Sequence, residues 1–247
     1  MKLLDLTLPS PAENLACDEA LLDAAEAGAG GEVLRFWESR EPFVVVGYAN
    51  KVSAEVNVAA CEARGIPILR RCSGGGTVLQ GPGCLNYTLI LKITEDGPLR
   101  TIASANRFIM ERNRAAIQSL YPNSELRTPN FEISVRGHAD LCLGNLKFSG
   151  NSQRRRKHYL LFHGTFLLNL DLALVGDLLR MPSKQPDYRG DRAHDDFLMN
   201  LNVSAEKVRT ALQRTWNVSG RLNEPPLEKA AALALEKYST RDWNFKF

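Results

Sequence analysis

Apolar and polar positions alternate with a period of two in several short segments, and this pattern predicts β-strands. The clearest case is residues 86–93, in which Tyr87, Leu89, Leu91 and Ile93 fall on one face. Further strands are predicted at residues 4–8, 33–37, 43–46 and 66–71, with several short ones between residues 131 and 170. The strands at 33–37 and 43–46 are expected to pair, because a short Glu-Pro turn separates them.

Apolar residues that recur every three or four positions predict helices elsewhere in the chain. Ser10, Pro11 and Glu13 form a capping box with proline at the first helical position, so a helix is expected from residue 11 to about residue 27. Helices are also predicted near residues 54–63, over 102–120, and over much of 171–238. Strands and helices are interspersed, which favours an α/β or α+β class with a mostly antiparallel sheet. No repeat or linker divides residues 1–247, so one domain is expected.

Composition narrows the range of functions. The chain has 247 residues and a net charge of +3, which is too small an excess to indicate a nucleic-acid partner. No apolar run approaches the roughly 20 residues of a membrane helix, and the N-terminus lacks the apolar core of a signal peptide. The five cysteines include no C-x-x-C pair, and the four histidines show no metal-ligand spacing. We therefore expect a cytoplasmic protein with no membrane partner, no disulfide framework and no protein-bound metal.

Three consecutive glycines follow the strand predicted at 66–71, in the segment Arg70-Arg71-Cys72-Ser73-Gly74-Gly75-Gly76-Thr77-Val78. Without Cβ atoms the backbone can take φ > 0, and its N–H groups can face a ligand at close range. The two arginines supply forked donors suited to phosphate or carboxylate, although a glycine-rich turn beside a solvated basic pair is the structural alternative. A P-loop is excluded because the chain has no G-x-x-x-x-G-K-[ST]. A dinucleotide fingerprint is excluded because a turn and a strand follow where a helix is required.

A lysine lies in the hairpin predicted around the two-residue turn Gly144-Asn145. Lys147 alternates with Leu146 and Phe148, so these neighbours are expected to point away from it. A single lysine on a strand is usually a surface residue. In a cleft that faces the glycines, it would instead bind a carboxylate and an α-phosphate together and stabilise the charge that develops when a carboxylate attacks ATP.

Two further segments carry candidate chemistry. His163, in His163-Gly164-Thr165, is a candidate base, a ligand contact or a hydrogen-bonded core histidine. The run Arg154-Arg155-Arg156-Lys157-His158 is either a solvated loop or a docking patch for an acidic protein partner.

Taken together, these segments resemble the biotin/lipoate protein ligase family, and the lipoate-protein ligases most closely. Residues 70–78 are similar to that family's R-R-x-S-G-G-G-[AT]-V adenylate-binding loop. Asp140-Leu141 with residues 147–153 is similar to its lysine motif, and residues 163–168 to its H-G-T-L-L strand. Weaker similarity in the first helix, the next two strands and residues 182–189 extends the resemblance over roughly residues 1–220. Four motifs in the right order are specific, although each alone is weak.

The resemblance implies a central sheet flanked by helices, of the class II synthetase and biotin ligase type. It implies that lipoate or octanoate reacts with ATP, which brings Mg²⁺ with it, to give an acyl-adenylate that is passed to a lysine of a lipoyl domain. Lys147 would contact both the carboxylate and the α-phosphate. The binding residues implied by the motif match are Arg71, Ser73, Gly74, Gly75, Gly76, Thr77, Val78, Leu79, Asn86, Asp140, Lys147, Ser149, Gly150, His163, Gly164 and Thr165.

The chain departs from the family's pattern in two places. Gln80 stands where the family's loop usually carries a histidine, which changes a contact to the ligand. The chain ends at Phe247, too early for the C-terminal accessory domain of many bacterial ligases. We therefore expect either a separate accessory subunit or a protein that catalyses part of the reaction.

Two rival functions remain open. An ATP-independent octanoyl- or lipoyl-transferase of the same fold needs a thiolate nucleophile, which such relatives place just before the lysine hairpin. Residues 121–138 contain no cysteine, Cys142 lies inside a predicted strand, and Cys84 is the other thiol near the glycines, so the ligase is favoured. The second rival is a non-catalytic ligand-binding protein that kept the fold.

Overall fold

The computed structural model describes residues 1–121 and 132–247. The strands are β1 (Lys2–Asp5), β2 (Val33–Trp37), β3 (Phe43–Val46), β4 (Ile68–Arg70), β5 (Val78–Gln80), β6 (Cys84–Lys92), β7 (Ile133–Arg136), β8 (Asp140–Leu143), β9 (Leu146–Arg155) and β10 (Tyr159–Leu167). Seven of them form the central sheet in the order β1-β2-β6-β10-β9-β8-β7, and a smaller sheet has the order β4-β3-β5. In the central sheet β1 and β2 run parallel and the other neighbours antiparallel, which confirms the predicted mixed α/β class.

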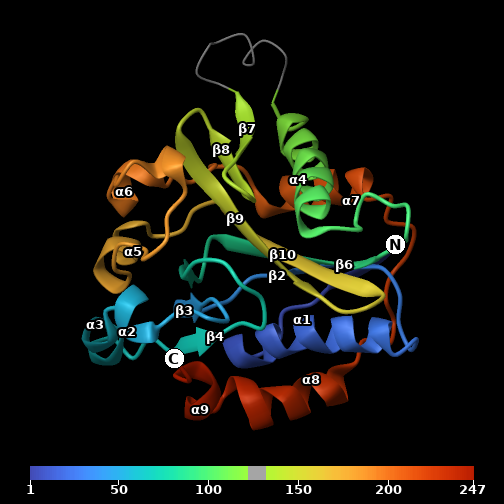
Figure 1. The fold of residues 1–247 in the computed structure, drawn as a ribbon, viewed down its shortest axis with the longest axis horizontal. Coiled ribbons are helices and arrows are strands. Elements are labelled where there is room, and N and C mark those ends of the chain that lie inside the picture. The colour runs from blue at the N-terminus through green and yellow to red at the C-terminus, as the bar shows by residue number, and fades with distance from the viewer. Residues whose placement is uncertain (122–131) are drawn as a thin grey trace.

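Helices cover both faces of the central sheet (Figure 1). The helices are α1 (Pro11–Glu26), α2 (Val52–Glu55), α3 (Val58–Ala63), α4 (Ile102–Gln118), α5 (Ala173–Leu178), α6 (His194–Phe197), α7 (Ala205–Thr215), α8 (Leu227–Leu233) and α9 (Arg241–Asn244), with a 3₁₀ turn η2 (Asp187–Arg189) and a π-helical turn η3 (Ala234–Tyr238). Helices α4 and α7 pack on one face of the sheet, whereas α1 and then α8 lie on the other. Within residues 1–121 and 132–247, no helix has both the length and the apolar character that a membrane span requires.

The first helix begins as its sequence predicts. The Ser10 hydroxyl accepts a hydrogen bond from the Glu13 backbone N–H, and the Glu13 carboxylate accepts one from the Ser10 backbone N–H. Pro11 occupies the first turn, where its missing N–H costs nothing. The predicted hairpin is also confirmed: β8 ends at Leu143, β9 begins at Leu146, and Gly144 takes the left-handed conformation with φ of 56°.

Two expectations from the sequence are wrong in detail. Strands β2 and β3 do not pair with each other, because β2 lies between β1 and β6 while β3 lies between β4 and β5. The chain passes from the large sheet to the small one between Trp37 and Phe43, whose rings stack with centroids 6.3 Å apart. The helix predicted near 54–63 is divided into α2 and α3, because residues 56 and 57 leave the helical conformation and Val56 bridges to Leu179.

The C-terminal segment is bound to the strand that leads into the glycines. Arg70, at the end of β4, is fully buried and donates hydrogen bonds to backbone carbonyls on both sides of it. Its acceptors are the carbonyl oxygens of Gly47, Tyr48, Asn50, Trp243 and Asn244. The guanidinium therefore holds α9 and the segment after β3 against the start of the glycine-rich loop.

Candidate functional site

A cavity of about 900 Å³ lies between the α1 face of the central sheet, the glycine-rich loop and the segment that follows β10. The predicted binding residues that line it are Arg71, Gly75, Gly76, Thr77, Val78, Leu79, Asn86, Asp140, Lys147, Gly150, His163, Gly164 and Thr165. Three others stand apart from the lining: Ser73 and Ser149 are buried behind it, and Gly74 is exposed. The fold thus gathers three segments that are far apart in the sequence around one space.

One row of neighbouring strand positions crosses the sheet beneath this cavity. Trp37 pairs with Asn86, Asn86 with Thr165, Thr165 with Gly150, and Gly150 with Asp140. Paired residues point to the same face of a sheet, and neighbouring strands are about 4.8 Å apart, so the row spans roughly 19 Å. All five residues line the cavity, which therefore has a floor that runs from Trp37 at one end to Asp140 at the other.

A register shift brings Lys147 to the Asp140 end of this floor. Asp140 pairs with Gly150, but Cys142 pairs with Lys147, so Phe148 is an extra residue without a partner on β8. A bulge of this kind changes the face to which the following side chains point. Phe148 packs into the core on the opposite face, as expected of this neighbour, and Lys147 points into the cavity.

Lys147 is held by an ion pair at the edge of the cavity. Its Nζ lies 2.8 Å from Asp140 Oδ1, and the two side chains are 21% and 15% exposed. The Tyr188 hydroxyl donates a hydrogen bond to the other carboxylate oxygen at 2.8 Å. Burial and the neighbouring Asp140 charge raise the pKa of Tyr188, so its hydroxyl remains a donor. The ammonium group is thus oriented before any ligand arrives.

The glycine-rich loop is shaped by the arginine that precedes it. Gly75 has φ of +86°, and a Cβ at this position would lie 2.9 Å from Arg71 Nη2. The buried Arg71 guanidinium donates to the carbonyl oxygens of Gly74 and Gly76, and burial lowers its pKa to about 10. Arg71 therefore lies in the cavity wall, but its donors are used to fix the loop rather than left free for a ligand.

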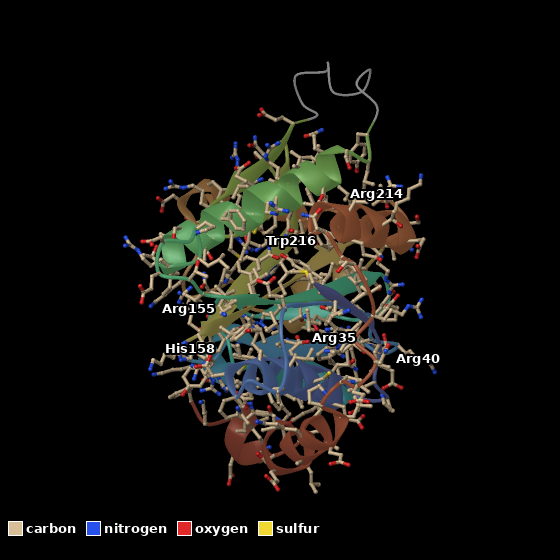
Figure 2. All side chains as sticks on the ribbon, turned by 90° about the vertical axis from the view of Figure 1, so that its right-hand side faces the viewer. Arg35, Arg40, Arg155, His158, Arg214 and Trp216 are labelled. Carbon is tan, nitrogen blue, oxygen red and sulfur yellow. The ribbon has the colours of Figure 1, made fainter. Side chains whose placement is uncertain are left out.

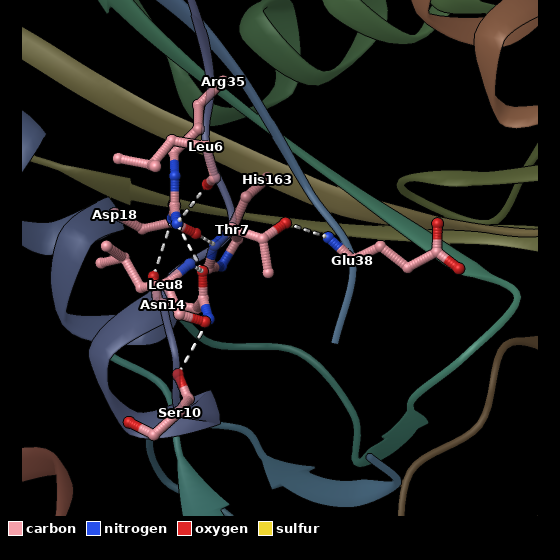
Figure 3. A network of polar contacts seen from close by, with 9 residues as sticks. All are labelled: Leu6, Thr7, Leu8, Ser10, Asn14, Asp18, Arg35, Glu38 and His163. Carbon is pink, nitrogen blue, oxygen red and sulfur yellow. Dashed lines mark hydrogen bonds and ion pairs between the residues drawn. The ribbon is translucent and has the colours of Figure 1, made fainter. Parts of the chain in front are cut away.

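A chain of buried polar contacts links this loop to the sheet and to α1. Figure 3 shows its part from His163 through Asp18 to Arg35 and Asn14. Ser73 Oγ lies 2.6 Å from His163 Nε2, and His163 Nδ1 lies 3.1 Å from Asp18 Oδ2. Asp18 Oδ1 accepts from Arg35 Nη1 at 2.6 Å, and neither side chain is more than 2% exposed. Asn14 adds acceptors for Arg35 through its side-chain and backbone oxygens. His163 is therefore a bridge between the loop and the core as well as a cavity-lining residue.

Asp18 and Arg35 are not among the site residues predicted from the sequence, although the position of each in its element is unusual for a charged residue. Arg35 is the one charged residue in the strand VLRFW, and Asp18 lies on the buried side of α1. Burial alone raises the pKa of Asp18, but the Arg35 charge and the His163 hydrogen bond outweigh it and hold the pKa below its ordinary value. This contribution to stability is therefore present at neutral pH and is lost as the pH falls through the folded pKa.

The five cysteines all lie in the described residues, all are buried, and none lines the cavity. Burial raises the pKa of the Cys84 thiol to about 12 and also raises that of Cys142. The Cys142 Sγ lies 3.6 Å from the Tyr188 hydroxyl oxygen, and that hydroxyl donates to Asp140. Neither thiol has the lowered pKa and the access of a cysteine nucleophile.

The side chains of Arg154, Arg155 and Arg156 do not gather in one patch, because each contacts a different part of the protein. Arg155 donates to two backbone carbonyls before α4, and Arg156 forms a 2.8 Å ion pair with Asp23. Figure 2 shows Arg155 and His158 on the same side of the molecule. Arg154 points the other way, with its guanidinium carbon 5.7 Å from the ring centre of the exposed Tyr48. Arg154 is the arginine of this run that contacts Tyr48, whose backbone N–H bonds to Ser73 at the start of the glycine-rich loop. It is therefore the candidate for docking a partner beside this loop.

Comparisons with known proteins agree with this geometry. Residues 10–215 match the family model described as Lipoyl protein ligase A/B catalytic domain. The chain is 27% identical to octanoyltransferase LipM of Geobacillus kaustophilus, over 96% of this chain and 94% of that protein. Its structure is similar to lipoate-protein ligase A bound with ATP, at 28% identity and a TM-score of 0.77 over 99% of this chain and 98% of the other. It is also similar to a bi-partite lipoate protein ligase of Thermoplasma acidophilum, studied with its E2 lipoyl domain, at 25% identity and a TM-score of 0.79 over 99% and 95% of the two chains.

The buried Arg35 pair generates a stability prediction. Asp18→Ala leaves the Arg35 charge buried without its counter-ion, and we expect a loss of about 3–5 kcal/mol in the free energy of unfolding. Asp23→Ala removes the same charge from the same helix, but Asp23 pairs with partly exposed Arg156 and Lys229, so the expected loss is about 1 kcal/mol or less. Urea denaturation of both variants measures the difference, and equal losses would show that the Arg35 pair has no special role.

Proposed function

This chain belongs to the lipoyl protein ligase A/B catalytic-domain family, and we propose that within it the chain is a lipoate-protein ligase. In this proposal it activates lipoate or octanoate with ATP and transfers the acyl group to a lysine of a lipoyl domain. The observation that carries the proposal is a cavity lined by both the glycine-rich loop and Lys147, whose ammonium is held by Asp140, while every thiol lies outside it.

The first step is activation of the acid. A carboxylate oxygen attacks the α-phosphorus of ATP, pyrophosphate leaves with its Mg²⁺, and an acyl-adenylate forms. Lys147 contacts the carboxylate and the α-phosphate, and because Asp140 has already oriented it, little reorganisation is needed as charge develops. Gly75 and Gly76 line the same cavity, and in this proposal their backbone N–H groups serve the phosphate.

The second step is transfer to the acceptor. The ε-amine of the acceptor lysine attacks the acyl carbonyl carbon, and AMP leaves with the oxygen that joined it to the acyl group. The Thermoplasma ligase similar to this chain is bi-partite and was studied with its lipoyl domain, which supports a lipoyl-domain acceptor and a separate accessory subunit as partners in this proposal.

An ATP-independent octanoyltransferase is the second candidate, and the similarity to LipM favours it. That reaction passes the acyl group through an enzyme thiolate. In this chain Cys84 and Cys142 do not line the cavity, and burial raises the pKa values of both thiols. The position of the thiols therefore supports the ligase over the transferase.

Lys147→Ala tests the central role in the ligase proposal. We expect lipoate-dependent exchange of pyrophosphate into ATP to fall by about 10²–10³, because a charge-stabilising group at the reaction centre is lost. Lys157→Ala, in the exposed turn at the other end of β9, is the matched control and should keep wild-type exchange. Normal exchange in a folded Lys147→Ala variant would contradict the assignment.

Cysteine replacements separate the two candidate functions. We expect Cys84→Ala and Cys142→Ala each to keep transfer to a lipoyl domain within a few-fold of wild type, because neither thiol contacts the cavity. The measurement is acyl transfer under conditions in which circular dichroism shows each variant folded. Loss of a trapped acyl-thioester together with all transfer in either variant would support the transferase instead.

Acceptor recognition is tested at Arg154. Arg154→Glu reverses a charge beside the loop, where Lys246 Nζ also lies 3.6 Å from the Tyr48 ring centre. We expect slower transfer to an acidic lipoyl domain, fading as salt screens the charges, with adenylation unchanged. Lys157→Glu is the control, since Lys157 is exposed at the hairpin tip. If both variants transfer at the same rate, Arg154 has no particular part in docking.

A further inference from the structure

A second row of paired residues lies beside the cavity floor. Arg35 pairs with Thr88 across β2 and β6, and Thr88 pairs with His163 across β6 and β10. His163 in turn pairs with Ser152 on β9. Each member lies two residues along its strand from a residue of the floor, so the row points to the same face of the sheet. His163 and Ser152 both line the cavity, yet activation at Lys147 uses neither of them.

Ser152 begins a continuous chain of hydrogen bonds that leads from the cavity to a buried carboxylate. Its Oγ lies 2.8 Å from Ser73 Oγ, and Ser73 Oγ lies 2.6 Å from His163 Nε2. His163 Nδ1 lies 3.1 Å from Asp18 Oδ2. Ser73 and Asp18 are no more than 1% exposed, so bulk water does not interrupt the inner part of this hydrogen-bond chain.

Neighbouring charges fix the direction of these hydrogen bonds. Charged groups on three elements face the hydrogen-bond chain: Asp18 on α1, Arg35 on β2 and Arg71 before the glycine-rich loop. Burial raises the pKa of Asp18, but the Arg35 charge and the His163 hydrogen bond outweigh it and keep the pKa below its ordinary value. Asp18 is therefore a carboxylate that accepts from His163 Nδ1–H, which leaves Nε2 of the neutral imidazole as an acceptor.

Ser73 carries this direction outward to Ser152. The Ser73 hydroxyl donates to His163 Nε2, and its oxygen accepts from Arg71 Nε at 3.1 Å. A hydroxyl has one donor and two acceptor positions, so the remaining position at Ser73 accepts from the Ser152 hydroxyl. Ser152 thus donates inward and presents acceptor lone pairs to the cavity. Such a group receives an N–H donor and not a phosphate or carboxylate oxygen.

Ser152 lies between the reacting end of the cavity and its exposed rim. Gly150 lies beside the Lys147 ammonium, since a Cβ there would be 2.9 Å from Nζ. Ser152 follows two residues later on the same face of β9, or about 7 Å along the strand. A Cβ at the exposed Gly75 would lie 3.4 Å from Ser152 Cβ. A lysine side chain that enters past the loop toward an acyl group at Lys147 therefore passes Ser152.

The acceptor lysine needs a group that removes a proton. An ε-ammonium with a pKa of about 10.4 is present as free amine in roughly one molecule in 10³ at about pH 7, and the free amine alone has a lone pair with which to attack. We infer that Ser152 and Ser73 relay a proton from the acceptor lysine to His163, which thereby acts as the base of the transfer step. The inference rests on the proposed function, because it assumes an acyl-adenylate and a lysine acceptor.

The proton transfers and bond changes balance in one sequence. The ammonium gives a proton to Ser152 Oγ while the Ser152 proton passes to Ser73 and the Ser73 proton to His163 Nε2. The Asp18 carboxylate stabilises the imidazolium that results. The amine lone pair then forms the bond to the acyl carbon, the C–O bond to AMP breaks, and AMP leaves with its electron pair. The second proton on nitrogen goes to water, and the imidazolium returns its proton to water along the same path.

Two nucleophiles distinguish a relay from a mere support for the loop. Hydroxylamine is unprotonated at neutral pH and needs no base, whereas the acceptor lysine needs one. Added lipoyl-AMP bypasses the activation step, so the rates report transfer alone. Ser152→Ala removes the outer hydroxyl and keeps the contact between Ser73 and His163 that holds the loop. His163→Gln is the second variant, because an amide cannot accept the proton.

Transfer from lipoyl-AMP to a lipoyl domain and to hydroxylamine is measured for wild type and both variants. In Ser152→Ala and in His163→Gln we expect the lipoyl-domain rate to fall by roughly 10² more than the hydroxylamine rate. Ser134→Ala is the matched control and should keep the wild-type ratio of the two rates. Ser134 is a half-buried serine on β7 of the same sheet and does not line the cavity.

The pH profile of transfer to the lipoyl domain gives a readout that loop structure alone does not change. Without the relay the rate follows the fraction of free amine, so in Ser152→Ala it should rise about tenfold per pH unit from about pH 7 toward the lysine pKa. In wild type the neutral imidazole takes the proton, and the rate should stay nearly flat over the same range.

Equal loss with both nucleophiles would overturn the inference, and so would a wild-type profile as steep as that of Ser152→Ala. Either result would make the hydrogen-bond chain a support for the loop and nothing more. Failure of the proposed function would look different: wild-type protein would exchange no pyrophosphate with lipoate and ATP, whatever the variants do with lipoyl-AMP.

Discussion

The buried ion pair between Arg35 and Asp18 is the interaction on which the site depends. It joins the second strand of the sheet to the first helix, and through His163 and Ser73 it continues to the glycine-rich loop. A buried charge is tolerated when it is paired and hydrogen-bonded, and the two terminal nitrogens of Arg35 have acceptors on Asn14 and Leu6 in addition to Asp18. The loop that approaches the ligand is therefore fixed to the most buried part of the protein.

The row of paired residues that forms the cavity floor explains why the two ends of the cavity differ in polarity. The floor is a single row of paired positions across five strands, so its two ends belong to different structural environments. At one end Asp140 and Tyr188 orient the Lys147 ammonium near solvent, where the proposed function places phosphate and a carboxylate. At the other end Trp37 and Asn86 are each only 2% exposed, and Trp37 stacks with Phe43. A chain molecule with an anionic head and a less polar tail fits this gradient.

Much of this could be predicted from the sequence, because it rests on local signals. The capping box at Ser10, the turn at Gly144 and the glycines after Arg71 are each encoded within a few residues. What could not be predicted depends on contacts between distant residues. Arg35 and Asp18 meet only when β2 packs under α1, and the one-residue shift at Phe148 that directs Lys147 into the cavity comes from pairing with β8. The separation of β2 and β3 into two sheets likewise depends on tertiary contacts, since both strands are fully buried.

The central claim is that this chain joins the acid to AMP, and oxygen transfer tests it most directly. Lipoate labelled with ¹⁸O in its carboxylate is incubated with the protein, ATP, Mg²⁺ and a lipoyl-domain acceptor, and the AMP is analysed by mass spectrometry. The account predicts one labelled oxygen in each AMP released, because the carboxylate oxygen that attacks the α-phosphorus leaves with it. Lipoylated acceptor formed with unlabelled AMP, or formed from an acyl-carrier thioester without ATP, would contradict it.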